Sequence, residues 1–181
     1  MRLEDDIRWQ RLHEVFGGVF DIGFDHPDAW PHGSRRASGL DVLKEGEDKL
    51  GTDLCQLGPL RYIRCALPLP ILGSEAVFGY GVWAEVAPDD FTAYLTAWDA
   101  EDYSEFSGAA AALANALPGW NIATPVAAKM RVTSPEVRPA LWVDPAAHPI
   151  GAAQQRGISF DVLLDIYAEA GSDLRPQLEQ P

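Results

Sequence analysis

Both cysteines of the chain, Cys55 and Cys65, lie in the stretch TDLCQLGPLRYIRC. Two thiols this close along a chain can ligate a metal, form a redox pair, form a disulfide or pack as small apolar side chains. The Gly-Pro pair between two β-prone runs favours a hairpin. We expect a three-residue loop that pairs Leu57 with Arg61, because it gathers both cysteines on one apolar face, whereas a two-residue loop pairing Leu57 with Leu60 separates them.

In that three-residue register Cys55 lies opposite Ile63, and Cys65 is only a diagonal neighbour at about 7–8 Å. Disulfides span a Cα separation of about 4.4–6.8 Å, which is shorter. We therefore predict two buried thiols that act as small hydrophobes.

Arg64 alternates with Ile63 and Cys65 in the same run, close to the strand that contains Trp83. An arginine on a sheet face beside aromatic rings can bind a carboxylate or a phosphate at two points. It can equally stack on an exposed tyrosine with no ligand, which is the commoner role. If a ligand site exists, we expect it in a sheet-edge cleft lined by Arg64, Trp83, Asn115, Arg138 and His148.

Two histidines, His26 and His32, bracket the segment PDAWP, and with Asp28 they could converge on a metal ion. Zinc sites normally use three or four protein ligands, and no further ligand can be named. Ordinary hydrogen-bonded loop histidines are the preferred interpretation, so we expect no metal and no cofactor.

Recognisable catalytic motifs are absent from the sequence. The run GYGVWA, residues 79–84, matches the letters of a dinucleotide fingerprint but lies inside a predicted strand, where the required strand-turn-helix context is missing. No nucleophile elbow, phosphate loop or zinc-protease motif occurs. We name no catalytic residue and lean against an enzyme.

The charge balance restricts the possible partners. Fourteen basic and twenty-seven acidic residues give a net charge of −13, and the only lysines are Lys44, Lys49 and Lys129. Nucleic acid and anionic membranes are therefore not expected as partners. A basic protein partner remains open.

The hydrophobic pattern predicts an α+β fold with a mainly antiparallel sheet of about five strands flanked by helices. We expect a single compact domain over residues 1–170 and a loose tail over 171–181. Helices are predicted at 3–16, 88–98, in the alanine-rich segment 106–119, in a short form before Gly157, and after Ser159 as N-cap. Strands are predicted on both sides of the hairpin, and at 75–87, 121–133 and 137–144, with the prolines of LPLPIL (67–72) marking an edge or connecting segment.

No apolar run is long enough for a membrane helix, and the N-terminal residues lack the apolar centre of a signal peptide. The two cysteines give no disulfide framework. Together these features favour a cytoplasmic protein.

Several segments in consistent order, among them GFDHPDAW, YIRCALPLPILG, FGYGVW, NALPGW and VRPALWVDPAAHPIGAAQQRGIS, resemble one bacterial family known as domain of unknown function 2199. The resemblance extends from about Gly23 to Ile166 and implies no reaction or substrate. Many members begin with a Cys-x-x-Cys-Gly and a following His, whereas this chain has Arg8 and Arg11 in the matching stretch. Such a start resembles a zinc knuckle. If the zinc is structural, which a two-cysteine start favours, apolar packing in an N-terminal helix can replace it. If it is catalytic, this member lacks the activity.

Three hypotheses follow from the sequence. The first is a non-catalytic binding or interaction module with an acidic surface and tryptophans available as interface anchors. The second is a small-ligand binder or an enzyme of unrecognised type with its site near Arg64. The third is a metal-binding protein that uses His26, Asp28 and His32.

Overall fold

The structure is a computed structural model that describes residues 3–179. Its helices are α1 (Leu3–Phe16), α2 (Arg35–Ser38), α3 (Pro88–Ala100), α4 (Pro149–Arg156), α5 (Phe160–Glu169) and α6 (Arg175–Leu178). Its strands are β1 (Ile22–Gly23), β2 (Leu43–Glu45), β3 (Asp48–Leu50), β4 (Leu54–Leu57), β5 (Leu60–Pro70), β6 (Val77–Val86), β7 (Gly108–Leu113), β8 (Val126–Arg131) and β9 (Ala140–Val143). The predicted α+β class is confirmed.

All nine strands belong to one sheet, and five of them close into a barrel. The barrel runs β5-β6-β7-β8-β9 and returns to β5, with antiparallel pairs except for the parallel contact between β9 and β5. The short strands β4, β3 and β2 continue from β5 as an antiparallel ribbon, and β1 pairs with β6 in parallel. The sheet is therefore mixed, while most of its pairs are antiparallel as expected.

One edge of β5 changes partner in the middle of the strand, which forks the sheet. Ile63 still pairs with Leu54 of β4. The next outward N–H, from Arg64, donates to the carbonyl of Asp53, and the one after that, from Ala66, donates to Pro139 just before β9. The ribbon and the barrel thus separate at Arg64.

Beyond the fork the open edge of β5 is closed by a side chain. The buried amide of Gln154 donates to the carbonyls of Leu141 and Pro68, and its oxygen accepts from the N–H of Val143. Pro68 and Pro70 direct their carbonyls to this side, away from β6, so neither proline removes a hydrogen bond from the β5–β6 ladder. The expected edge segment is for this reason a continuous part of β5.

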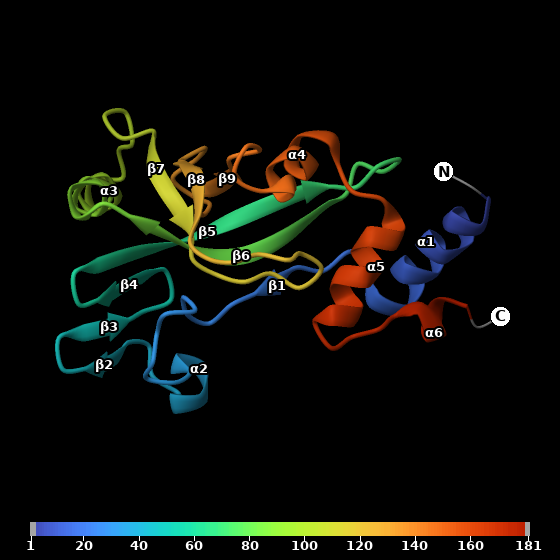
Figure 1. The fold of residues 1–181 in the computed structure, drawn as a ribbon, viewed down its shortest axis with the longest axis horizontal. Coiled ribbons are helices and arrows are strands. Elements are labelled where there is room, and N and C mark those ends of the chain that lie inside the picture. The colour runs from blue at the N-terminus through green and yellow to red at the C-terminus, as the bar shows by residue number, and fades with distance from the viewer. Residues whose placement is uncertain (1–2, 180–181) are drawn as a thin grey trace.

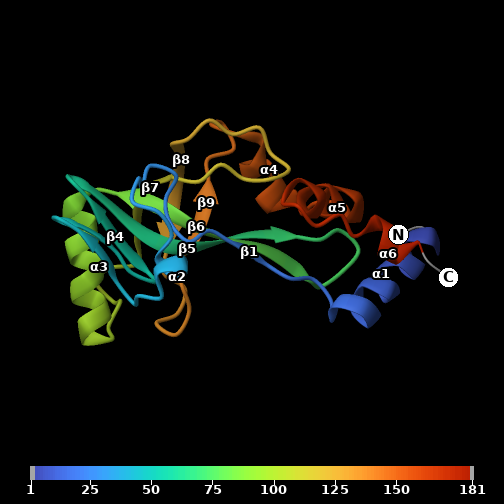
Figure 2. The same ribbon diagram turned by 90° about the horizontal axis from the view of Figure 1, so that it is seen from below.

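Two apolar clusters pack on opposite faces of β5 and β6. The main core fills the barrel and extends to α1, α3, α5 and α6, with fully buried Ile63, Cys65 and Leu67 among its members. The second cluster lies on the outer face and contains Cys55, Tyr62, Trp83, Trp30, Leu43, Leu50 and Ala114. Figures 1 and 2 show α3 at one end of the molecule and α1, α5 and α6 together at the other.

The hairpin expectation was wrong in its register. Leu57 pairs with Leu60 across a two-residue loop, because Gly58 adopts φ 53°, the left-handed backbone that such a loop needs at its first position. Cys55 therefore lies opposite Tyr62 on the outer face, and Cys65 points into the barrel. Both are buried free thiols, as predicted, and burial raises the pKa of Cys55 to about 12.

The alanine-rich segment is not a helix, as we had predicted, but strand β7. Alanine has a high helix propensity, but here tertiary pairing overrides it, because the segment fits between β6 and β8. Gly108 marks the close approach, since a Cβ there would lie 2.2 Å from the carbonyl oxygen of Met130.

The helices at 3–16, at 88–98 and after the Ser159 N-cap are confirmed as α1, α3 and α5. The segment expected to be loose after residue 171 contains α6, and Leu174 and Leu178 are buried against the core. Among the described residues, no helix is long and apolar enough to cross a membrane.

We predict that Gln154→Leu destabilises the fold strongly. The substitution leaves two buried backbone groups and one partly buried carbonyl without the amide that pairs with them, and the free energy of unfolding should fall by about 3 kcal/mol. Chemical denaturation measures this, with Gln155→Leu on the exposed neighbouring position as the matched control. Equal stability of the Gln154 variant and the wild type would contradict this role.

Candidate functional site

Arg64 is the centre of the candidate site. It projects from β5 on the outer face of the sheet, directly across from Trp83 of β6, and its guanidinium carbon lies 5.7 Å from the centre of the Trp83 ring. Arg64 is only 4% exposed and Trp83 is fully buried. The guanidinium therefore packs on the face of a buried aromatic ring.

Two glycines make room for this side chain. A Cβ at Gly23 of β1 would lie 2.9 Å from Nη2 of Arg64, and a Cβ at Gly81 of β6 would lie 3.4 Å from the same atom. Gly81 also lets β1 approach, since its Cβ would lie 3.3 Å from the Cα of Gly23. Gly81 of the run FGYGVW and Gly23 thus leave the space that the Arg64 side chain occupies across the strands.

An ion pair flanks Arg64 on each side. At the fork of the sheet, Nε of Arg138 donates to Oδ1 of Asp53 at 2.7 Å. In the segment before and within α2, Asp25 pairs with Arg36 at 3.4 Å and with Arg35 at 3.8 Å. We call these four arginines and two aspartates the arginine cluster, and it carries more positive than negative charge.

Hydrogen-bond partners are missing at the centre of the arginine cluster. Within residues 3–179, five buried side-chain polar atoms have no hydrogen-bond partner, and three of them are Nε of Arg64, Nε of Arg35 and Oδ1 of Asp25. No described group accepts a hydrogen bond from the Arg64 guanidinium. Buried polar groups are rarely left unpaired, so the concentration of such atoms here makes the arginine cluster the candidate site.

The ionisation states follow from burial and charge. Burial lowers the pKa of Arg64, and the neighbouring Arg138 and Arg36 lower it further, but a guanidinium keeps its proton at neutral pH. Burial opposes ionisation of Asp25, yet hydrogen bonds from Ser34 and from the N–H of Arg36 outweigh it and hold the pKa of this carboxyl below its usual value. Ionised Asp25 therefore stabilises the folded protein at pH values above the usual pKa of an aspartate. That stabilisation is lost as the pH falls through the lowered pKa of the folded state.

The arrangement is suited to binding negative charge. Arginine offers a planar set of donors that matches a carboxylate or a phosphate. Arg64 has lost its hydration to burial, and each neighbouring aspartate is already paired with another arginine. An anion on Arg64 would supply the charge and the acceptors that the protein itself does not provide.

The residues expected to line a ligand site fall into two groups. Arg64, Trp83 and Arg138 lie together, and Asn115 supports them, because its Oδ1 accepts from the N–H of Trp83 at 2.8 Å. His148 has separate partners: it caps α4 by accepting from the N–H of Ile150 and its Nε2 lies 2.9 Å from the carbonyl oxygen of Asn121. No described contact joins it to Arg64.

The three residues considered as metal ligands have other partners. His26 contacts the carbonyl oxygen of Pro27, and His32 pairs with Asp48 at 2.8 Å. Asp28 accepts from Asn115 and from the N–H of Ala116, which fixes the loop before α2 against the barrel. In the part of the chain that the structure describes, no three His, Cys, Asp or Glu side chains are grouped to hold a metal ion.

Sequence reasoning missed Gly23, Gly81, Asp25, Arg36 and Asp53. The alternating glycines in a strand were a usable signal, because glycine inside a strand often marks a close approach. The acidic partners gave no such signal, since they come from loops that meet Arg64 only in the folded chain.

The fold and the arginine cluster define an α+β barrel protein with a group of arginines around the buried Arg64. The chain belongs to the family described as an uncharacterized protein conserved in bacteria (DUF2199), whose model matches residues 10–158. This range includes every residue of the arginine cluster. No curated protein and no solved structure matches the chain.

We predict that Arg64→Met stabilises the protein in a buffer free of multivalent anions. Methionine fills a similar space without a buried unpaired charge, so the free energy of unfolding should rise by about 1 kcal/mol or more. Chemical denaturation measures the change, with Arg131→Met on the exposed face of β8 as the control. A loss of stability in the Arg64 variant would show that the guanidinium is a structural element.

Proposed function

We propose that this protein binds a small anionic ligand, a carboxylate or a phosphate, on the guanidinium of Arg64. The observation that carries the proposal is that Arg64 is 4% exposed, that its buried Nε has no hydrogen-bond partner, and that its guanidinium has no ion-pair partner among the described residues. A charge held this way costs stability, and a ligand that neutralises it recovers that cost.

Selectivity follows from the surroundings. The guanidinium carbon lies 5.7 Å from the centre of the Trp83 ring, and Gly23 and Gly81 lie close to Nη2. Oδ1 of Asp25 accepts no hydrogen bond, although it lies 3.4 Å from Nε of Arg36. It favours a ligand that carries a hydrogen-bond donor, such as a hydroxyl group, next to its anionic group.

The direct test is thermal unfolding with inorganic phosphate or succinate, against sodium chloride at equal ionic strength. A ligand that binds only the folded state at one hundred times its Kd adds about 2.7 kcal/mol. For a chain of this size that raises Tm by roughly 5–10 °C. We expect a saturable rise in the wild type and none in Arg64→Met. The same rise in both proteins would contradict the proposal.

Gly23→Ala tests the geometry of the site separately from its charge. The new Cβ would lie 2.9 Å from Nη2 of Arg64 and near no backbone atom, so we expect little loss of stability in the unliganded protein. The Cβ displaces the guanidinium from the face of the Trp83 ring, and we expect the affinity for phosphate or succinate to fall about tenfold. Isothermal titration calorimetry measures the affinity, and unchanged affinity would show that the glycine does not position Arg64.

A further inference from the structure

A second surface lies around Trp98 of α3, where two hollows meet. The larger hollow, about 340 Å³, lies between α3 and the β2–β4 ribbon, and its apolar lining includes Val42, Leu54 and Phe91. The smaller hollow, about 300 Å³, lies beyond the end of α3 and is lined by Glu101, Tyr103, Pro135 and Glu136. Trp98 lines both hollows, and we call this surface the Trp98 groove.

Large apolar side chains are exposed in the Trp98 groove. Trp98 is 39% exposed and Val42 is 44% exposed. Tyr94 meets the edge of the Trp98 ring at 5.7 Å, which holds the ring in place. An exposed, supported tryptophan beside an apolar hollow has the character of an interface anchor.

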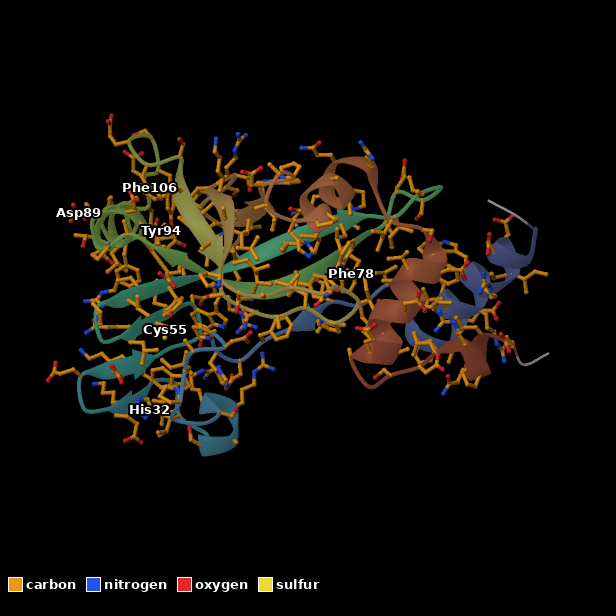
Figure 3. The ribbon with its side chains drawn as sticks, viewed as in Figure 1. His32, Cys55, Phe78, Asp89, Tyr94 and Phe106 are labelled. Atoms are coloured by element: carbon orange, nitrogen blue, oxygen red, sulfur yellow. The ribbon has the colours of Figure 1, made fainter. Side chains whose placement is uncertain are left out.

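Negative charge dominates this end of the molecule. Helix α3 carries Asp89, Asp90 and Asp99 and no basic residue, and Figure 3 shows Asp89 at its outer side and Tyr94 toward the sheet. Glu101 and Glu136 line the smaller hollow. Lys49 lines the larger hollow, and Asp53 there is already paired with Arg138.

Glu101 is present at a local cost. It adopts φ 54° at the C-cap of α3, and it is the one non-glycine residue within 3–179 with a positive φ. Glycine is preferred at this position, and a negative charge at a helix C-terminus opposes the helix dipole. A glutamate here lowers the stability of the helix end while it supplies a carboxylate to the smaller hollow.

We infer that the Trp98 groove binds a protein partner through a basic segment. An apolar side chain of the partner packs against Trp98 in the larger hollow, and a lysine or arginine enters the smaller hollow between Glu101 and Glu136. Asp53 lies at both places, but the segment is bound through Trp98, Glu101 and Glu136, so this inference does not rest on the proposed anion site.

The test uses a fluorescent acetyl-GKLRLKG-amide peptide as probe and measures fluorescence anisotropy at low salt. We expect saturable binding that weakens as salt is raised. Trp98→Ala should weaken it at least about tenfold, against little change in Trp142→Ala, which removes a comparably exposed tryptophan of β9.

Glu101→Gly distinguishes an effect on binding from an effect on folding. It removes the carboxylate, and it also places a glycine where the backbone has a positive φ, which should not lower stability. We expect an unchanged or higher Tm with peptide affinity reduced about fivefold, against no change in Glu75→Gln on the distant β5–β6 turn. The inference is overturned if the cationic peptide does not bind, if acetyl-GELELEG-amide binds as well, if the two tryptophan variants weaken binding equally, or if Glu101→Gly binds like the wild type.

Discussion

At Arg64 one edge of β5 stops pairing with β4 and begins to pair with the segment leading into β9. A strand that serves two partners along one edge cannot hold both ladders together without help. On the ribbon side the carbonyl of Asp53 takes the last N–H, and on the barrel side the amide of Gln154 replaces the missing strand. The Arg138–Asp53 ion pair bridges the two branches. The loops that meet Arg64 are therefore fixed by the same contacts that close the barrel.

The fork also explains why a charge is buried there. The outer face of β5 and β6 is apolar along the ribbon, where Tyr62 and Trp83 pack with Trp30. Arg64 lies at the edge of this cluster, over Trp83 and against two glycines, and water cannot surround it. In a protein of net charge −13, these contacts hold a local excess of positive charge.

The sequence identified the elements whose signals are local. The helix that begins with Pro88, the Ser159 cap and the alternating strand that contains Trp83 all formed as predicted. The errors came from tertiary effects. The positive φ of Gly58 permits a two-residue hairpin loop. The pairing of β7 with β8 overrides the helix propensity of its alanines. Gln154 pairs with the carbonyl of Pro68, so a long strand can contain this proline. Barrel closure itself depends on one parallel contact between residues distant in sequence, which no local pattern shows.

The sequence also identified only part of the candidate site, because its residues come together through tertiary contacts. Arg64, Trp83 and Arg138 were named from the sequence because residue type and strand position suffice to suggest them. Asp25 and Asp53 lie on loops and Arg36 lies in α2, and their approach to Arg64 depends on the fork. His148 was included although its contacts are with Asn121 and Ile150. The absence of a partner for the guanidinium can only be read from the folded chain.

The most direct measurement of the central claim is the Nε–H resonance of Arg64 in ¹H–¹⁵N spectra, assigned by its absence in Arg64→Met and followed during titration with phosphate or succinate. The account predicts that this resonance shifts in a saturable way and exchanges more slowly with water, while the exposed Arg131 and Arg156 do not respond. A resonance that stays in place, or that moves together with those of the exposed arginines, would contradict it.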